Sequence, residues 1–263
     1  MNNTVKVIIL CGGMGTRLRE ETELIPKPMV MIGERPMLWH IMKIYSAAGF
    51  DDFVLTLGYK GDVIRRYFMD YPTFASDFTV HLKSGGTTVH RDARGIEPWN
   101  ITLAETGFST MTGGRVKRAG QYVDGDTFMV TYGDGVADIN PRELLEFHRS
   151  HGKLATVTAV RPSARFGQLT ISEDSRQVQH FEEKPQASEG WINGGFFVFQ
   201  REVLDYLTDD TCVLEHSPLR RLAEEGQLVA FRHQSFWACM DTGRELQQLR
   251  QAWEHDAPWR IWE

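Results

Sequence analysis

Short apolar runs alternate with amphipathic stretches along most of this chain. Residues 7–11, 53–57 and 128–132 are segments rich in apolar and β-branched side chains. Such runs are typical of strands that are buried on both faces of a parallel sheet. Between them, residues 36–49 and 62–68 follow the pattern of helices, the first ending at Gly49. The alternation predicts an α/β fold with a Rossmann-like mixed, mostly parallel sheet flanked by helices.

The alternation is interrupted after residue 68. Residues 79–82 and 87–91 flank Ser84-Gly85-Gly86, a pattern that predicts an antiparallel hairpin. We expect a small antiparallel β excursion over about 77–105, in a place common for subunit contacts. No repeat or flexible linker divides the chain, so we expect residues 1–263 to form a single domain. Further strands are predicted at 101–105, 154–160, 168–171, 177–181 and 196–199, and further helices at 141–151, 202–207, 217–225 and 243–253.

Composition limits the classes of protein that fit. The 41% hydrophobic and 24% charged residues are ordinary for a soluble globular protein, and no window is long and apolar enough for a membrane span. A net charge of −6 without a basic run argues against a nucleic-acid partner. Cys11, Cys212 and Cys239 lie far apart, which predicts buried thiols in a reducing compartment. With no signal peptide near Met1, we expect a cytoplasmic protein without nucleic-acid or membrane partners.

The first apolar run ends in a glycine-rich turn that could bind phosphate. Residues 12–15 are Gly-Gly-Met-Gly, which lets the backbone turn tightly and bring its N–H groups close to an anion. Thr16 adds a hydroxyl group, and Arg17 adds a planar fork of donors suited to a phosphate. The spacing matches neither the dinucleotide-binding fingerprint nor a P-loop. An ordinary glycine-rich turn between strand and helix is the alternative.

Three charged residues later in the chain could complete a phosphate-binding site with this turn. Lys27 stands between Pro26 and Pro28, whose restricted backbones would aim its ammonium group, whereas a solvated lysine would not explain two prolines. Asp134 follows the strand at 128–132, and Asp241 follows the segment 236–239. Ligands of open α/β sheets lie beyond the carboxyl ends of strands, and Mg²⁺ prefers a few carboxylates with phosphate oxygens. The alternative to metal binding is that Asp134 is an ordinary turn residue and that Asp241 is an acid favoured by the dipole at the start of a helix.

At these residues the chain resembles the sugar-1-phosphate nucleotidyltransferases. The similarity runs from about Val5 to residues 259–263, and within the family it is greatest to members that use CTP and glucose 1-phosphate. The motifs that carry it are residues 12–18, 26–29, 39–43, 97–100, 111–115, 132–138 and 192–197.

The resemblance implies a reaction. The phosphate oxygen of glucose 1-phosphate would attack the α-phosphorus of CTP in line, with Mg²⁺ as cofactor, giving CDP-glucose for CDP-sugar biosynthesis of the dideoxyhexose, O-antigen (lipopolysaccharide) type. Arg17, Lys27 and Asp134 would be catalytic, and Asp134 and Asp241 would hold the metal. The family also implies a homo-oligomer, a trimer or a hexamer. A catalytically silent regulatory relative is expected to lack Lys27 or one of the aspartates, and a dehydrogenase would need a third glycine.

The resemblance also assigns the two substrate sites. The segment 106–115 is expected to be a loop beside the base, and because it lacks the Gln-Pro and Gly-Leu-Ala sequences of relatives that use dTTP or UTP, CTP is favoured over those alternatives. The sugar-binding part is expected over about 161–240. The nucleotide site would comprise Leu10, Gly12, Gly13, Gly15, Thr16, Arg17, Thr110, Gly114 and Arg115. The sugar-phosphate site would comprise Lys27, Gly167, Glu183, Lys184, Asn193 and Gly194.

Several residues lie outside these assignments. Cys11 stands where relatives have alanine, and Ile25 where they often carry a basic residue, so one phosphate contact is expected to be missing. His148 and His151 lie three apart on a predicted helix without a third metal ligand, which favours a solvated helix end. Tryptophans near the end of the chain are expected to anchor it to the body or to a neighbouring subunit: Trp253, Trp259 and Trp262.

Overall fold

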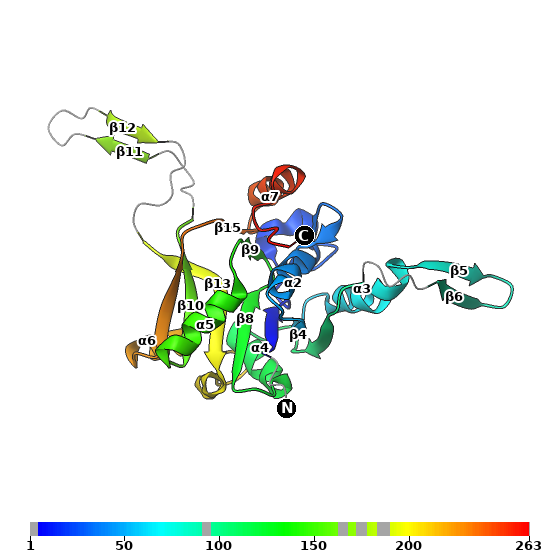
Figure 1. Ribbon diagram of the computed structural model, residues 1–263, viewed down its shortest axis with the longest axis horizontal. Helices are drawn as coiled ribbons and strands as arrows, with labels where there is room; N and C mark the ends of the chain where they lie inside the picture. The colour runs from blue at the N-terminus through cyan, green and yellow to red at the C-terminus, as the bar shows by residue number, and fades with distance from the viewer. Residues whose placement is uncertain (1–4, 91–95, 163–167, 172–177, 183–189, 263) are drawn as a thin grey trace.

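The computed structural model describes residues 5–90, 96–162, 168–171, 178–182 and 190–262. In this part of the chain, seven strands form one sheet in the order β14-β10-β13-β8-β1-β4-β7 (Figure 1). β13 is antiparallel to both of its neighbours, and the other described pairs are parallel, so the predicted mixed, mostly parallel sheet is confirmed. The strands are β14 (Leu228–His233), β10 (Ala155–Val160), β13 (Ile192–Gln200), β8 (Thr127–Tyr132), β1 (Val7–Leu10), β4 (Asp52–Leu57) and β7 (Asn100–Glu105).

Strand β1 lies at the centre of the parallel part of the sheet. Its last residue, Leu10, is level with Thr56 in β4 and with Tyr132 in β8. The segments that leave β1 and β8 therefore start side by side at one edge of the sheet. This register brings the glycine-rich turn after Leu10 next to the segment that carries Asp134.

Helices cover both faces of the sheet, because the sheet strands are apolar on both sides. Val7 and Ile9 pack into one hydrophobic cluster, whereas Ile8 and Leu10 pack into another. The first cluster includes side chains from α2 (Met37–Ala47), α3 (Gly61–Phe74), α5 (Pro141–His151) and α7 (Gly243–His255). The second includes side chains from α4 (Thr112–Ala119), the 3₁₀ helix η4 (Arg201–Tyr206) and α6 (Ser217–Glu224).

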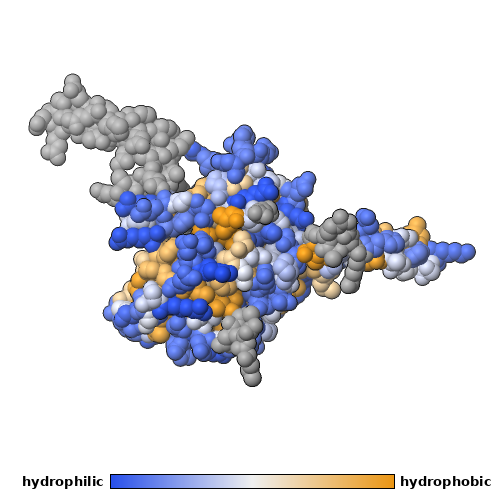
Figure 2. Space-filling view, in the orientation of Figure 1, coloured by the Kyte–Doolittle hydropathy of each residue, from blue (hydrophilic) through white to orange (hydrophobic). Residues whose placement is uncertain are grey.

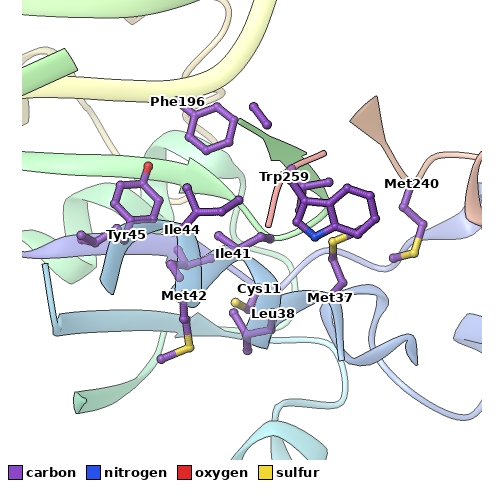
Figure 3. Packing of buried hydrophobic residues seen from close by; sticks show 14 of the residues in the cluster. Cys11, Met37, Leu38, Ile41, Met42, Ile44, Tyr45, Phe196, Met240 and Trp259 are labelled. Atoms are coloured by element: carbon purple, nitrogen blue, oxygen red, sulfur yellow. The ribbon is translucent and has the colours of Figure 1, made fainter. Parts of the chain in front are cut away.

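Helix α2 forms the centre of the larger cluster. Figure 3 shows Tyr45 and Ile44 of this helix beside Phe196 of the sheet, and Met37 beside Trp259 near the C-terminus. Trp259 is fully buried, and its ring stacks on that of Trp253 and lies against His40 of α2. Trp253 and Trp262 pack against the same cluster. The predicted anchoring of the chain end to the body is confirmed.

Local capping signals place the ends of two helices where they were predicted. Asn140 accepts a hydrogen bond from the backbone N–H of Arg142, Pro141 begins α5, and Gly152 ends it with a φ of 63°. In α7, the hydroxyl of Thr242 accepts from the N–H of Glu245, whose carboxylate accepts from the N–H of Thr242. This reciprocal pair satisfies N–H groups that have no partner within the helix.

The structure differs from the sequence expectations at several elements. Residues 201–206 form a 3₁₀ rather than an α-helix, and α3 runs to Phe74, through Pro72. Strand β14 was missed because it lies at the sheet edge, half-exposed and without a continuous apolar run. The remaining short elements are η1 (Thr16–Leu18), α1 (Arg19–Thr22), η2 (Lys27–Met29), β2 (Met31–Ile32), β3 (Arg35–Pro36), η3 (Gly120–Tyr122), β9 (Gly135–Ala137) and β15 (Trp237–Cys239).

Besides the short β2–β3 and β9–β15 pairs, two longer antiparallel pairs lie outside the main sheet in the described residues. β5 (Asp77–His81) and β6 (Gly86–His90) form the predicted excursion, which projects from the body in Figure 1. Because β7 pairs with β4 in the main sheet, the excursion ends before Asn100 and not at residue 105. β11 (Gln168–Ile171) and β12 (Val178–Glu182) form the second pair, as predicted.

Two further expectations concern membranes and cysteines. None of the helices in the described ranges combines the length and apolar character needed to cross a bilayer. Cys11 and Cys212 are buried free thiols, as predicted, whereas Cys239 is partly exposed. Burial and the nearby carboxylates of Glu245 and Asp241 raise the pKa of Cys239 to about 12.

The expectation that His148 lies at a solvated helix end is wrong. His148 lies on the inner face of α5, with no exposed surface, in line with buried Leu144 one turn earlier. Its Nδ1 is 2.8 Å from Oγ1 of Thr156, and the same hydroxyl is 2.8 Å from Nε2 of His151. Burial lowers the pKa of His148 to about 4. The folded protein therefore holds this ring neutral.

We predict that His148 makes the protein sensitive to acid. The unfolded chain protonates this ring near its ordinary pKa of 6.5, but the folded protein does so only near 4. Its contribution to stability is thus complete above pH 6.5 and is lost as the pH falls toward 4. Between pH 7.5 and 5.5, wild type should lose about 1 kcal/mol more unfolding free energy than His148→Gln.

Urea unfolding followed by circular dichroism at the two pH values measures this difference. His255→Gln, an exposed histidine at the end of α7, is the matched control and should keep the wild-type pH dependence. Equal pH dependence of wild type and His148→Gln would contradict the prediction.

Candidate functional site

The structure brings together three charged residues that are far apart in the sequence. Nζ of Lys27 lies 2.6 Å from Oδ2 of Asp134 and 2.6 Å from Oδ1 of Asp241. Lys27 begins the short helix η2 immediately after Pro26. Pairing of β15 with β9 sets Cys239 opposite Gly135, and the N–H of Met240 donates to the carbonyl of Asp134. These contacts hold the two aspartates at the same end of the sheet.

The charges of this cluster balance one another. Nη1 of Arg17 lies 2.8 Å from Oδ2 of Asp241, so two cations face two carboxylates. Burial alone would lower the pKa of Lys27, but the charges and hydrogen bonds of Asp134 and Asp241 outweigh burial and raise it. Lys27 therefore remains an ammonium group between the two carboxylates.

The donor set fits a magnesium ion that also binds phosphate. The ammonium group of Lys27 lies between the two carboxylates, where positive charge is favoured. Mg²⁺ commonly takes one or two carboxylates and completes its shell with phosphate oxygens and water. Within the described ranges, no three or more His, Cys, Asp or Glu side chains form a cluster able to hold a metal ion. Asp134 and Asp241 thus suit a metal that is completed by a substrate.

The glycine-rich turn after β1 is shaped by its neighbours. A Cβ atom on Gly12 would lie 2.1 Å from Nη1 of Arg115, so no larger residue fits at that position. Gly15 has a φ of 61°, in the left-handed region that glycine adopts readily. A Cβ atom on Gly13 would meet no heavy atom within 4 Å, which leaves that part of the turn open. The turn can therefore approach a ligand closely.

The buried side chain of Arg115 supports this turn through hydrogen bonds. Its side chain is almost fully buried, and its Nη1 donates to the carbonyl of Leu57 and the hydroxyl of Thr106, at 3.0 and 2.7 Å. Its Nη2 donates to the carbonyls of Gly12 and Phe108, at 3.0 and 3.3 Å. Burial lowers the pKa of Arg115, but an arginine stays charged in a protein. One guanidinium group thus joins the segments that follow β1, β4 and β7.

The segment 106–115, expected to be a loop, is a loop only up to Met111. Helix α4 begins at Thr112 and includes Gly113 and Gly114. A Cβ atom on Gly113 would lie 2.7 Å from Sγ of Cys212, and one on Gly114 would lie 2.8 Å from the carbonyl oxygen of Asp209. The glycines are thus required by close packing in a helix. Gly114 faces that packing contact, away from the cavity described next.

These elements surround a cavity of about 490 Å³. Its lining includes most of the predicted nucleotide-site residues and both aspartates. It also includes Phe108, which belongs to the segment 106–115 predicted to lie beside the base, and Tyr132, which was not among the predicted site residues. The predicted residues along it are Leu10, Gly12, Gly13, Gly15, Thr16, Arg17, Lys27, Thr110, Arg115, Asp134 and Asp241.

A second cavity, of about 290 Å³, adjoins the first and shares Tyr132, Asp134 and Asp241 with it. The predicted sugar-site residues Asn193 and Gly194 line it. Trp237, which the sequence prediction missed, also lines it, and its indole N–H donates to the carbonyl of Gly194 at 2.7 Å. Lys27, also predicted for the sugar-phosphate site, lines the larger cavity instead. The remaining predicted residues of this site, Gly167, Glu183 and Lys184, lie outside the described residues.

Comparison with known proteins gives the class of this chain. The family model described as "Nucleotidyl transferase" matches residues 6–256. This chain belongs to the nucleotidyl transferase family. The expected family resemblance is thereby confirmed.

Similar proteins narrow the comparison. The chain is 49% identical to a glucose-1-phosphate cytidylyltransferase of Salmonella typhi, over 98% of this chain and 100% of the relative. It is 42% identical to a probable glucose-1-phosphate cytidylyltransferase of Bacillus subtilis, with the same coverage. The solved structure of HddC from Yersinia pseudotuberculosis has a TM-score of 0.66 at 22% identity, covering 94% of this chain and 98% of that one. The structural similarity supports the fold alone.

Proposed function

We propose that this protein transfers the cytidylyl group of CTP to glucose 1-phosphate, giving CDP-glucose and pyrophosphate. The observation that carries the proposal is the full-length 49% identity to a relative named for this reaction, together with Lys27, Asp134 and Asp241 meeting beside a nucleotide-sized cavity. Transfer of UTP- or dTTP-derived groups is the alternative.

In this reaction a phosphate oxygen of glucose 1-phosphate forms a bond to the α-phosphorus of CTP. The bond from that phosphorus to the bridging oxygen breaks, and pyrophosphate leaves with the electron pair. Such chemistry depends on positioning and on neutralising charge, without a covalent intermediate on the protein. Lys27 binds phosphate oxygens at the reacting centre, and Arg17 offsets the charge of the leaving pyrophosphate. The glycine-rich turn at 12–15 supplies backbone N–H groups.

Asp134 and Asp241 would hold the magnesium ion. The ion would supply positive charge to the phosphate oxygens when it is bound. Because Lys27 hydrogen-bonds to both carboxylates, it can pass from them to phosphate oxygens over a short distance. Lys27 would then keep its charge at the centre of the reaction.

The larger cavity would hold CTP and the smaller one the sugar phosphate. In the larger cavity, Leu10, Gly12, Gly13, Thr16 and Thr110 would contact the nucleotide, with Gly15, Gly114 and Arg115 supporting it. Backbone N–H and carbonyl groups of 108–111 can pair with the cytosine edge. In the smaller cavity Asn193 and Gly194 would contact the sugar, and we assign Gly167, Glu183 and Lys184 to the same site from the family resemblance.

We also propose that the protein is a homo-oligomer, a trimer or a hexamer, assembled through the β5–β6 hairpin. One face of this hairpin is apolar and exposed: Phe78, Val80 and Val89 are 42%, 51% and 37% exposed. The opposite face is polar, with Thr79 hydrogen-bonded to His90. Figure 2 shows apolar atoms along this projecting arm. A second copy of the chain would cover them. Cytoplasmic location and a role in CDP-sugar and lipopolysaccharide biosynthesis belong to the same proposal.

A panel of four nucleoside triphosphates tests the reaction. Each of CTP, UTP, dTTP and GTP is supplied with glucose 1-phosphate and Mg²⁺, and pyrophosphate release is measured. We expect CTP to be used with the highest kcat/KM and chelation of magnesium to abolish turnover. Preference for any other base would contradict the proposal.

We predict that Lys27→Ala keeps the fold and loses most turnover. Removal of one preorganised charge at a reacting phosphate lowers kcat by about 100-fold or more. Lys153→Ala, at an exposed lysine beyond α5, is the matched control and should behave as wild type. Circular dichroism verifies folding of both variants. A folded Lys27→Ala variant with wild-type kcat would remove Lys27 from the mechanism.

We predict that Val80→Asp on the apolar face of the hairpin dissociates the oligomer. A charge that becomes buried at a subunit contact without a partner is strongly unfavourable. Thr79 directly precedes Val80 and points to the opposite, polar face of the hairpin. Thr79→Asp is therefore the control and should leave the mass unchanged. Light scattering after size-exclusion chromatography gives the masses. A monomeric wild type, or an unchanged mass of Val80→Asp, would contradict the proposal.

A further inference from the structure

Four side chains form a continuous hydrogen-bonded chain between the two cavities. The hydroxyl of Thr112 donates to Oε2 of Glu215 at 2.7 Å, and the hydroxyl of Tyr132 donates to Oε1 of the same carboxylate at 2.5 Å. The Tyr132 oxygen in turn accepts from Nδ2 of Asn193 at 3.0 Å. Thr112 lines the larger cavity, Asn193 lines the smaller one, and Tyr132 lines both. The carboxylate of Glu215 joins the chain, because it accepts hydrogen bonds from both Thr112 and Tyr132.

At the nucleotide end, the segment 209–215 fixes the start of α4. The N–H of Leu214 donates to the hydroxyl of Thr112 at 2.9 Å, so this hydroxyl must turn its proton toward Glu215. The N–H of Met111 donates to the carbonyl of Asp210, and the N–H of Gly114 donates to that of Cys212. Any ligand that moves residues 110–112 therefore moves the groups that hold Glu215.

At the sugar end, Tyr132 and Asn193 have defined orientations. The ring of Tyr132 packs against Gly195, where a Cβ atom would lie 2.5 Å from Cδ2 of the ring. Oδ1 of Asn193 accepts from the N–H of Gly195 at 2.8 Å, which turns the amide N–H₂ group toward Tyr132. Burial and the charge of Glu215 raise the pKa of Tyr132, so its hydroxyl stays a donor to that carboxylate.

We propose that Glu215 is a positioning residue that couples the two substrate sites, so that binding of the nucleotide orients Asn193 for the sugar phosphate. The proposal rests on the function proposed above. A nucleotide that contacts residues 110–112 and shifts them also shifts Thr112, and Thr112 shifts the carboxylate that orients Tyr132 and Asn193. By thermodynamic linkage, the sugar phosphate must strengthen nucleotide binding by the same factor.

Calorimetric titration measures this factor directly. The probe is a CTP analogue with a methylene bridge between the α- and β-phosphorus, which binds with Mg²⁺ but cannot transfer its nucleotidyl group. We expect glucose 1-phosphate to lower the Kd of the analogue about 10-fold in wild type. In Tyr132→Phe, which keeps the ring and loses only the hydroxyl, and in Glu215→Ala, the ratio of the two Kd values should fall to within about twofold of one.

A second tyrosine–glutamate pair provides the matched control. The hydroxyl of Tyr206 donates to the carboxylate of Glu225 on the exposed surface near α6, and neither residue lines the two cavities. Tyr206→Phe and Glu225→Ala should keep the wild-type ratio. If Glu215 acted only through stability, its variants would lose affinity for both ligands without a change in this ratio.

The outcomes separate the two proposals. A wild-type ratio in folded Tyr132→Phe and Glu215→Ala proteins, or a ratio of one in wild type, would contradict the coupling role of Glu215. Turnover of CTP with glucose 1-phosphate by wild type is measured in parallel. Its absence would contradict the proposed function, whereas turnover with unchanged coupling would contradict the role of Glu215 alone.

Discussion

The site depends on holding two carboxylates and one ammonium group together in a partly buried place. Only 13% of the Lys27 side chain is exposed, and a charge at such a depth is costly unless it is paired and hydrogen-bonded. Asp134 and Asp241 provide that pairing, but they come from segments more than a hundred residues apart. The short β9–β15 pair resolves this by fixing the two backbones to each other beside the end of β8.

The loops of the larger cavity depend on a second buried cation in a similar way. Arg115 satisfies carbonyl groups from three segments that leave three neighbouring strands. The carbonyls of Leu57 and Gly12 also accept from the backbone N–H groups of Thr106 and Tyr59, so the guanidinium group joins segments that backbone hydrogen bonds already link. This arrangement requires glycine at position 12, because only a residue without Cβ can lie against the guanidinium group. The glycine-rich turn is thus determined as much by what supports it as by what it could bind.

The sequence was sufficient for features that arise from local pattern. Apolar runs located β1, β4 and β8. The rule that ligands lie beyond the carboxyl ends of strands correctly predicted that Asp134 and Asp241 meet. The structure brings Asp241 there differently, because β15 lies outside the main sheet and pairs antiparallel with β9. The sequence failed where packing outweighs propensity. Gly113 and Gly114 suggested a loop, yet both lie in helix α4. Only glycine fits there, because Cys212 and Asp209 pack directly against these two positions. His148 was predicted to be solvated, but it lies on the inner face of α5 and is buried. Glu215 could not be found, since its partners Thr112 and Tyr132 are 103 and 83 residues away.

The ammonium group of Lys27 has a consequence for the order of events at the site. It acts as an internal counter-ion, and with Arg17 it leaves the four charged groups without net charge. A lone divalent ion that arrives from solution must compete with a tethered cation already in contact with both acids. The triphosphate of the proposed substrate would remove that competitor, because its oxygens would bind Lys27 in place of the carboxylates. Under the proposed function, metal and nucleotide would therefore bind together, and the protein alone would bind free divalent ions only weakly.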